Sequence, residues 1–381
     1  MTDRVGIVAV AQTAGAPSDE NFYDLAFRVT RRCLDEAGVS RDEVGTVVSA
    51  ASDIFHGSIS CANAYYWEAV GAFMKNGTRE DAESLFALGY GAMRVLSGHH
   101  ETALVVALCK GSENPENDTL TGFFTDPFHL RPLGVNETSA AALQMQCYQT
   151  RHGVDRESCA AVAVKNLGNA LDNPLAHRKG RYTVDEVLAS PSPAHPLTEL
   201  ECAPKSDGFV AVLLASEKRA RSLCDRPVWL SGYGSAVDTY HLGDRDLCEG
   251  VLPAAAARAY RMAGIQDPAR EIHLAEITEP YAFQELLWCE HLGLCEPGGG
   301  ARLLASGATQ RDGALPVNPS GGVLANNPYV SRGLQRVAEA FLQIRGEAGE
   351  RQVSREVRTA LAHGTHGFCG QCHAVAVLSI E

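Results

Sequence analysis

Continuous apolar runs and stretches of helical periodicity alternate along the chain. Residues 21–37 place their apolar side chains on one face of a helix, and Gly38 follows at the position of a C-cap glycine. Residues 84–96 have the same helical character, with apolar positions on much of the surface. The apolar runs around these two helices predict strands buried on both faces, at Val5–Val10, Val44–Val48 and Thr102–Leu108.

Residues 112–205 have a different pattern. They contain few strand signals, two helical stretches at 137–151 and 155–171, and several breakers that contain Pro. Strand character returns at Gly208–Ser216. We therefore expect a mainly helical segment inserted between two strands.

The second part of the chain repeats the first. An Ala-rich helix over 252–263 ends at Ala263-Gly264, as the first helix ends at Ala37-Gly38. The other expected elements are strands at 228–232, 272–277 and 374–378 and a helix at 331–345. A duplicated unit of this kind implies two packed mixed sheets, with active groups on loops at strand ends where the halves meet. We place the halves at residues 1–225, which include the insertion at about 112–205, and at residues 226–381.

Charge and composition narrow the class of protein. The formal net charge of −13 argues against a nucleic-acid protein, which needs clustered Lys and Arg. No apolar stretch approaches the roughly 20 residues that span a bilayer. The N-terminus enters a strand-like run without a signal peptide, and the 12 Cys are scattered. We expect a cytoplasmic protein with reduced thiols.

The stretch His363–His373 carries the densest group of reactive side chains and has three interpretations. Cys369-x-x-Cys372-His373 matches the spacing of a c-type haem attachment site, which the expected cytoplasmic location disfavours. His363, His366, Cys369 and Cys372 have a spacing that a metal cluster could use. The third interpretation is a glycine-punctuated loop that presents a thiol and an imidazole to an organic substrate.

Several short phrases occur in an order that resembles the thiolase superfamily over essentially the whole chain. They are Thr125–Gly134, Ala163–Asn166, Asn173–His177, Ser206–Gly208 and Val317–Val323. The resemblance is closest to the sterol-carrier-protein-type thiolases. It implies an α/β thiolase fold, in which duplicated βαβαβ halves form a layered α/β/α/β/α sandwich with an inserted helical loop domain.

The reactive positions depart from the usual pattern of that family. The place of the nucleophilic Cys falls at residues 81–84, which contain no Cys. Asn326-Asn327-Pro328 replaces the Gly-His-Pro that normally follows Asn-Pro-Ser-Gly-Gly, and Thr278 stands at the usual Asn or His of the third loop. These departures resemble a subgroup of thiolase-like subunits that pair with a small zinc-ribbon/OB-fold protein and act in steroid or aromatic breakdown.

The resemblance supplies candidate site residues. Cys369 is the leading thiol, because either neighbouring imidazole would lower its pKa; an inert loop cysteine is the alternative. Asn327 would donate to a thioester oxygen, although Asn-Asn-Pro is also ordinary turn chemistry. The complete catalytic set is Cys369, His363, Asn327, His366, Glu279 and Tyr281, and the expected coenzyme A contacts are Arg131, His177, Lys205, Ser206, Ser320, Gly321 and Gly322. Asp81 and Glu83, at the place of the missing nucleophile, are more simply acids that cap a helix.

The predicted activity is CoA-dependent retro-Claisen cleavage of a bulky β-oxoacyl-CoA, with an aromatic one such as benzoylsuccinyl-CoA as the leading guess. One alternative is a retro-aldol lyase for a β-hydroxyacyl-CoA, which needs no nucleophilic thiol. Another is a non-catalytic subunit that binds acyl-CoA. Coenzyme A is expected as substrate without a metal in this chain. The expected assembly is a homodimer that recruits a zinc-ribbon/OB-fold subunit as a heterotetramer.

Overall fold

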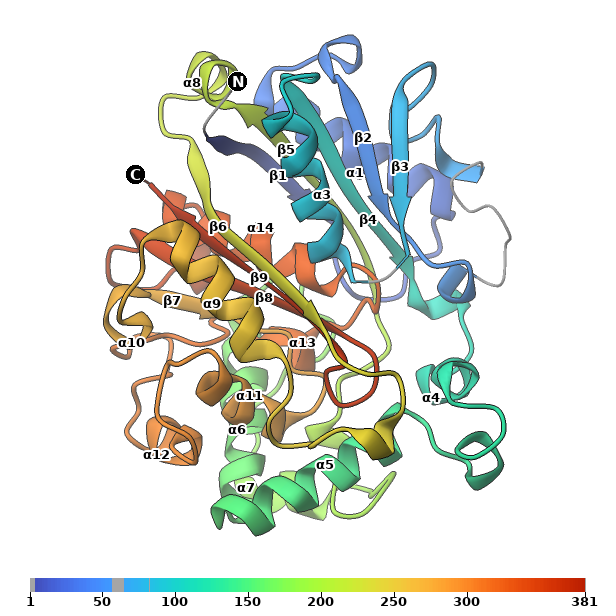
Figure 1. The fold of residues 1–381 in the computed structure, drawn as a ribbon, viewed down its shortest axis with the longest axis vertical. Helices are drawn as coiled ribbons and strands as arrows, with labels where there is room; N and C mark the ends of the chain where they lie inside the picture. The colour runs from blue at the N-terminus through green and yellow to red at the C-terminus, as the bar shows by residue number, and fades with distance from the viewer. Residues whose placement is uncertain (1–3, 57–64, 82, 381) are drawn as a thin grey trace.

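A computed structural model describes residues 4–56, 65–81 and 83–380, and in it the strands form one mixed sheet (Figure 1). The strand order is β3-β2-β4-β5-β1-β6-β9-β8-β7. The strands are β1 Val5–Gln12, β2 Thr46–Ala50, β3 Asn76–Glu80, β4 Thr102–Lys110, β5 Asp207–Ser216, β6 Val228–Val237, β7 Leu274–Glu276, β8 Thr359–His366 and β9 Cys372–Ser379. The sheet therefore begins with the strands of the first half and ends with those of the second.

The two groups of strands are joined over a very short length. Strands β1 and β6 pair only at Gly6 with Trp229 and at Ile7 with Val228. By contrast, β4 and β5 pair over their whole length, from Thr102 to Lys110. In the described part of the chain, the nine-stranded sheet thus consists of two mixed halves joined at one edge, in agreement with the predicted duplication.

Helices cover the sheet in layers. Helix α1 (Phe22–Ala37) packs on β1 and β5, and α9 (Leu252–Ala263) packs on β6 and β9, on the outer side of each half. Helices α3 (Ser84–Leu96) and α14 (Arg332–Arg345) contact each other and strands of both halves. They form the middle layer of an α/β/α/β/α arrangement, as Figure 1 shows.

Alternation along β4 explains this layering. Leu104 and Val106 join the apolar cluster under α1, whereas Val105 and Ala107 join the cluster formed with α3 and α14. Successive side chains of a strand point to opposite faces, so a strand buried on both faces must be apolar throughout. The continuous apolar runs of the sequence are therefore the signature of these layers.

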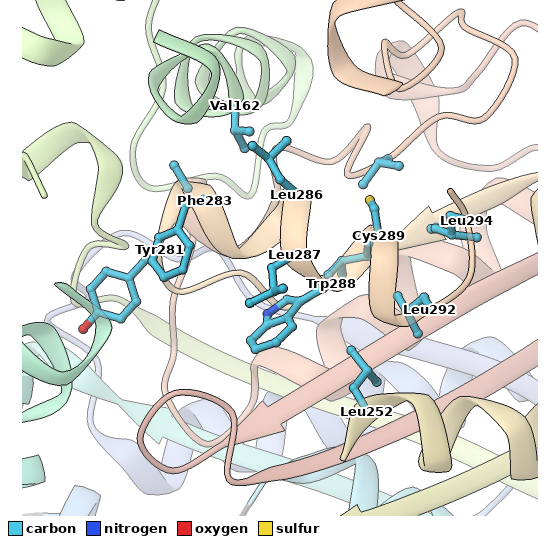
Figure 2. Packing of buried hydrophobic residues seen from close by; sticks show 14 of the residues in the cluster. Val162, Leu252, Tyr281, Phe283, Leu286, Leu287, Trp288, Cys289, Leu292 and Leu294 are labelled. Carbon is cyan, nitrogen blue, oxygen red and sulfur yellow. The ribbon is translucent and has the colours of Figure 1, made fainter. Parts of the chain in front are cut away.

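The predicted helical insertion lies between β4 and β5. Its helices are α4 Asn117–Thr121, α5 Glu137–His152, α6 Arg156–Asn169 and α7 Val184–Ala189. Helices α5 and α6 pack against α11 (Ala282–His291) of the second half. In Figure 2, Val162 of α6 and Leu286 of α11 lie in this contact, and Leu252 of α9 lies on the other side of α11. The remaining α-helices of the described residues are α8 Glu217–Leu223, α10 Pro268–Glu271, α12 Gly300–Ala305 and α13 Gly322–Ala325.

Most predicted elements are confirmed, and three details are corrected. The second strand begins two residues later than predicted, at Thr46. Strand β3 was not predicted, because Asn-Gly-Thr-Arg-Glu is polar and pairs with β2 at the sheet edge. His363 and His366 belong to strand β8 and not to a loop, although residues 367–371 do form a turn. The boundary of the two halves at residue 225 stays a prediction.

Candidate active site

A cavity of about 310 Å³ lies between the insertion and the second half of the chain. Its exposed end includes Glu116 and Lys205, whose side chains form an ion pair of 2.9 Å. Its buried end includes Glu137, Tyr281 and Asn327. Three residues predicted from the sequence, Lys205, Tyr281 and Asn327, therefore line one cavity together.

Glu137 is the first residue of α5, and its carboxyl group is buried at the cavity wall. Desolvation raises the pKa of Glu137 to about 7, against the opposing charge of Arg332. The Arg332 Nη2 atom lies 4.0 Å from its Oε1. A carboxyl group with a pKa near 7 can accept and return a proton at neutral pH.

Arg332 connects the cavity with the middle layer of helices. It donates from Nη1 to Asn327 Oδ1 at 3.4 Å and from Nη2 to the Thr365 carbonyl at 2.8 Å. Its guanidinium lies 4.5 Å from the centre of the Tyr329 ring. Because only 1% of Arg332 is exposed, these contacts hold it in one place beside Glu137 and Asn327.

Tyr281 precedes α11, and in Figure 2 its hydroxyl group points away from the labelled apolar residues of that helix. Its oxygen lies 2.9 Å from Thr138 Oγ1. Burial raises the pKa of Tyr281 well above its ordinary value. The hydroxyl group therefore stays protonated. Because the Thr138 hydroxyl donates to Asp118 Oδ1 at 2.8 Å, Tyr281 donates its own proton to Thr138 Oγ1.

The N-termini of α3 and α14 meet at Glu83. Its Oε2 accepts the Leu85 N–H at 2.7 Å, and its Oε1 accepts the Ser84 hydroxyl at 3.0 Å. Ser84 Oγ in turn accepts the Leu334 N–H at 2.8 Å. Burial raises the pKa of Glu83 to about 7. Glu83 therefore caps α3, which is the simpler of the two interpretations of its sequence position. Unlike an ordinary capping acid, it is buried inside the protein.

Cys369 lies in the turn between β8 and β9, with φ of 53°. Its Sγ donates to the Ala140 carbonyl at 3.2 Å, and it packs with Ala140, Leu242 and Phe368. Burial raises the pKa of Cys369 to about 12, above the ordinary value of a thiol. The expectation that a neighbouring imidazole lowers this pKa is therefore wrong, and the thiol is neutral in this structure.

The two outer histidines of the stretch form a buried pair. His363 Nε2 and His373 Nδ1 are 2.9 Å apart, and the rings are stacked with centres separated by 5.1 Å. Burial lowers the pKa of His363 to about 3 and that of His373 well below its ordinary value. Trp288 packs edge-on against both rings. Both imidazoles are therefore neutral and packed inside the protein.

His366 lines a second cavity, of about 300 Å³. Aromatic and aliphatic walls dominate this cavity, to which Arg245 adds a cation and Asp126 an anion. Its principal lining residues are Phe123, Phe124, Leu130, Tyr240, Leu242, Arg245, His366 and Phe368. The ring of His366 also contacts Tyr329 at 5.8 Å, the ring over which Arg332 lies. Tyr329 and Arg332 thus lie between the two cavities.

Glu279 does not line the first cavity, although its neighbours Pro280 and Tyr281 do. Its Oε1 accepts the Val323 and Leu324 N–H groups at 2.9 and 3.3 Å. Burial and the nearby Glu285 raise the pKa of Glu279 to about 8. A Cβ at Gly322 would lie 2.0 Å from Glu279 Oε1, so the glycine lets this carboxyl group reach helix α13.

The other predicted coenzyme A contacts are dispersed. Ser320 donates to Glu276 Oε2 at 2.8 Å and also accepts from Arg336, within a buried ion-pair network. Gly321 has φ of 101° and packs against Ala170. Ser206 accepts the Asn327 N–H at 3.1 Å, next to the first cavity.

His177 and Arg131 lie at two different places. The His177 N–H donates to the Ala325 carbonyl at 3.1 Å, close to the first cavity's lining residue Arg178. Arg131 donates to the carbonyls of Phe123 and Thr125, near the second cavity.

Sequence reasoning missed Glu137 and Arg332. Glu137 follows the N-cap Asn136, and an acid in a first helical turn is ordinarily an exposed group that interacts with the helix dipole. Arg332 similarly begins a helix. Only the packing of the insertion on the second half reveals that both side chains are buried together.

The described residues form neither a metal site nor a membrane-spanning helix. No group of three His, Cys, Asp or Glu side chains there is arranged to hold a metal ion. No helix in that part of the chain has the length and apolar character needed to cross a membrane.

Comparisons with known proteins agree with this architecture. A family model described as "Thiolase C-terminal domain-like" matches residues 234–380. Two solved structures share the fold. They are an "Ltp2-ChsH2(DUF35) aldolase" (TM-score 0.85, 21% identity, 99% of this chain and 98% of that one) and a monomeric SCP2-thiolase like protein from Mycobacterium smegmatis (TM-score 0.71, 18% identity, 100% and 78%).

Curated relatives match over most of their length. The benzoylsuccinyl-CoA thiolase subunit BbsB of Thauera aromatica is 30% identical over 292 residues, which are 74% of this chain and 75% of that protein. The acetyl-CoA acetyltransferase of Methanothermobacter thermautotrophicus is 32% identical over 360 residues, covering 92% of this chain and 93% of the relative. The chain therefore belongs to the thiolase family.

Proposed function

We propose that the chain catalyses CoA-dependent cleavage of a β-oxoacyl-CoA at the buried end of the first cavity. The observation that carries this proposal is the meeting there of Glu137, whose pKa is about 7, with Tyr281 and Asn327. The names of the curated relatives, an acetyltransferase and a thiolase subunit, support acyl transfer to coenzyme A as the reaction class.

Free CoA is the nucleophile of the proposed reaction. Its sulfur attacks the β-carbonyl carbon, and the S–H proton passes to the Glu137 carboxylate. The bond between the α- and β-carbons then breaks, its electron pair goes to the α-carbon, and Glu137 returns the proton to that carbon. One β-oxoacyl-CoA and one CoA thus give two acyl-CoA thioesters.

Two neutral donors stabilise the charge that develops on oxygen in this step. The Tyr281 hydroxyl, which donates to Thr138 Oγ1 in this structure, turns its proton to one carbonyl oxygen of the bound substrate. Asn327 accepts from Arg332 through Oδ1, which leaves its NH₂ group to donate to the thioester oxygen. Cys369 remains the predicted thiol of the site, and its raised pKa fits proton donation better than nucleophilic attack.

The acyl group in this proposal is bulky and aromatic. The second cavity supports that choice, because Phe123, Phe124, Tyr240 and Phe368 supply ring surfaces around it. His366 and Tyr329 stand between this space and Arg332. Benzoylsuccinyl-CoA, the substrate in the name of one relative, is the first compound to test.

Retro-aldol cleavage of a β-hydroxyacyl-CoA is the second candidate, because of two observations. The start of α3 presents Glu83 and Ser84, and the Cys369 thiol is neutral. A retro-aldol step needs only a base for the β-hydroxyl proton and a donor for the thioester enolate. Glu137 and Asn327 fit those two roles. A non-catalytic subunit that binds acyl-CoA is the third.

Product analysis separates these functions. The purified chain is incubated with benzoylsuccinyl-CoA or with a matched β-hydroxyacyl-CoA, with and without free CoA, and the thioesters are separated by chromatography. Thiolysis consumes one CoA and releases two thioesters, whereas retro-aldol cleavage releases an aldehyde or ketone without CoA. If neither thioester turns over, even with the partner subunit present, both catalytic proposals fail.

The proposed assembly is a homodimer with a small zinc-ribbon/OB-fold partner in the cytoplasm. The support is that one structural neighbour is titled as a complex of Ltp2 with a DUF35 protein, and one relative is named as a subunit. Co-expression with a DUF35 protein encoded beside this chain, followed by light scattering, tests both the dimer and the heterotetramer.

A further inference from the structure

Arg245 is the cation of the second cavity, and it lies there without an acidic partner. It belongs to the segment between β6 and α9 and is partly buried. From Nη1 it donates to the Phe368 carbonyl at 2.7 Å. Within the described ranges, neither its buried Nε nor its Nη2 donates to any group, and no carboxylate lies close enough to form an ion pair with it. One edge of the guanidinium, formed by Nε and Nη2, is therefore left for an acceptor that enters the cavity.

Asp126, the anion of this cavity, is engaged within its own turn. Its Oδ2 accepts the His129 N–H at 2.7 Å and lies 2.9 Å from Nδ1 of the same histidine. Its Oδ1 accepts the Phe128 N–H at 3.4 Å. Asp126 is thus satisfied without Arg245, although both line the cavity. A guanidinium beside apolar walls is costly without an opposite charge, so the cavity favours a ligand that brings its own anion.

Contacts on two sides fix the position of Arg245. Gln144 of α5 donates from Nε2 to the Leu247 carbonyl at 2.8 Å and to the Cys369 carbonyl at 3.1 Å. These two bonds tie the segment of Arg245 to the turn between β8 and β9. Leu242 of the same segment packs with Cys369 in one apolar group. The guanidinium is therefore held in place before a ligand arrives, which lowers the entropy that binding costs.

We propose that Arg245 binds a carboxylate carried by the acyl group of the substrate. The second cavity then selects an acyl group that has both an aromatic ring and a negative charge. This inference rests on the proposed function, in which the acyl group lies in this cavity. A carboxylate matches the two parallel N–H donors of the free guanidinium edge. Phe123, Phe124 and Phe368 provide ring surfaces for the remainder of the acyl group.

A carboxylate suits this cavity better than a phosphate does. A phosphate carries more charge and holds its hydration water more strongly, and the aromatic walls offer little to replace that water. Asp126 also lines the cavity and repels a dianion more than a monoanion. Benzoylsuccinyl-CoA has the required form, because a succinyl unit joined to CoA at one end keeps a free carboxylate at the other.

Isothermal titration calorimetry with a ligand that cannot be cleaved tests the inference without turnover. Benzylsuccinyl-CoA lacks the β-oxo group and keeps the free carboxylate, and its neutral match has a primary amide in place of that carboxylate. We expect the wild-type chain to bind the acid at least about tenfold more tightly than the amide, the effect of a charge-assisted hydrogen bond. Arg245→Gln should lose this preference by weakening the acid alone, and Arg245→Lys should keep part of it.

Three results would overturn the inference. The first is a wild-type chain that binds acid and amide equally. The second is equal weakening of both ligands in Arg245→Gln, which would mean that the arginine only supports the turn through the Phe368 carbonyl. The third is weaker binding of free CoA in that variant, which would place the guanidinium against coenzyme A instead. If Arg245→Gln does not fold, the wild-type comparison still decides, since a missing preference overturns the inference and a clear one supports it.

Arg151→Gln is the matched control. Arg151 pairs at 2.9 Å with Asp246, the residue that follows Arg245, but does not line the second cavity. Its side chain is 41% exposed, and an exposed ion pair of this kind contributes little. The variant should therefore keep the preference for the acid. A loss of that preference in Arg151→Gln as large as in Arg245→Gln would assign the effect to the shape of the segment and overturn the inference.

Two combinations of results separate this inference from the proposed reaction. A chain that prefers the acid through Arg245 but cleaves no β-oxo thioester has the carboxylate site without the reaction. A chain that cleaves β-oxo thioesters but binds acid and amide equally has the reaction without the carboxylate site.

Discussion

Glu137 is the residue on which the proposed chemistry depends most. We expect Glu137→Gln to lower kcat by about 100-fold or more, because a positioned acid–base group typically contributes that much. The wild-type kcat/KM should rise as the pH passes through about 7, since only the deprotonated carboxylate accepts the thiol proton. The variant should lack this limb. Steady-state kinetics between pH 5.5 and 9 measures both.

The control for this prediction is Glu199→Gln, which changes an exposed acid of the same cavity. Its kinetics should stay within about threefold of the wild type. A pH limb near 7 that persists in Glu137→Gln would assign the titrating group to another residue.

The variant Cys369→Ala directly tests the hypothesis that this thiol takes part in the reaction. The structure places this thiol in an apolar group with Ala140 and Leu242, protonated and donating to a carbonyl. We therefore expect Cys369→Ala to reduce kcat less than about tenfold, well below the loss that follows removal of a nucleophile. A loss of 1,000-fold or more in a folded variant would assign a nucleophilic role to this thiol.

At this scale the sequence predicted residues that line the first cavity, but not the charges around them. Tyr281 and Asn327 were expected at the site because their loops are placed there by the family pattern. Glu279 was expected in the same loop as Tyr281, yet its side chain points to helix α13. The sequence pattern tells which loop reaches the site, whereas the direction of each side chain depends on packing. The paired burial of Glu137 and Arg332 joins segments far apart in the chain and has no local signal.

Gly364 of β8 shows how closely the central elements approach one another. A Cβ added there would lie 2.1 Å from Glu83 Oε2, and this carboxyl group is held by the N-terminus of α3. We expect Gly364→Ala to lower the free energy of unfolding by about 2–4 kcal/mol, since buried groups must shift. Urea denaturation at pH 7 measures the change.

Gly168, inside helix α6, is the matched control. An added Cβ meets nothing within 4 Å there, and the residue has ordinary helical backbone. Gly168→Ala should therefore stabilise the protein by about 0.5–1 kcal/mol, the usual gain in helix propensity. If both variants lose stability alike, the close contact with Glu83 is not the cause.

The histidine pair of β8 and β9 predicts a sensitivity to acid. The folded pKa of His363 is about 3, below the ordinary value of 6.5, so the unfolded chain binds a proton first as the pH falls. Stability is therefore lost from about pH 6.5 downward, by about 2 kcal/mol at pH 5 for this histidine alone. His363→Gln should lose less stability over that range in urea denaturation at pH 7, 6 and 5.

Buried acids act in the opposite direction. The pKa of Glu83 is raised to about 7, so its contribution to stability is greatest at low pH and falls as the pH rises to 7. For this reason the comparison of wild type with variant, rather than the wild-type curve alone, isolates the histidine. Identical slopes in both proteins would contradict the assignment.

At the scale of elements, local sequence patterns were sufficient to predict a helix or strand where its burial is uniform. Helices α1 and α3 follow their predicted ranges, because their apolar faces or caps are encoded nearby. Strand β8 was not predicted, because its second half is polar and contains Gly364, and pairing with β9 makes it a strand despite that composition. Edge strand β3 is also polar, and its pairing with β2, not its composition, makes it a strand.

The whole molecule is joined through its middle layer. The two sheet halves share only two residue pairs between β1 and β6, whereas α3 and α14 pack on strands of both halves. The same apolar cluster includes Leu88 of α3, Val337 of α14, Val212 of the first half and Ala376 of the second. The duplication was visible in the sequence, but this shared core depends on how the two copies dock.

A shared core predicts that the two halves unfold together. Trp67 reports on the first half, where it packs over Gly77, and Trp288 reports on the second. In variants that retain only one of these tryptophans, with Phe at the other two positions, the urea transitions followed by fluorescence should coincide with the transition followed by circular dichroism. Each variant is compared with its own circular dichroism curve, so that a change in overall stability does not enter the comparison.

Two separated fluorescence transitions would show that each half folds independently and that the middle layer is only a contact surface. We expect coincidence because separating the halves would expose the apolar faces of both α3 and α14, which are buried among strands of the two sheets. The active-site cavity provides the same coupling, since Glu137 comes from the insertion of the first half and Arg332 from the second. A chain whose cavity needs both halves must fold them as one unit before that cavity is complete.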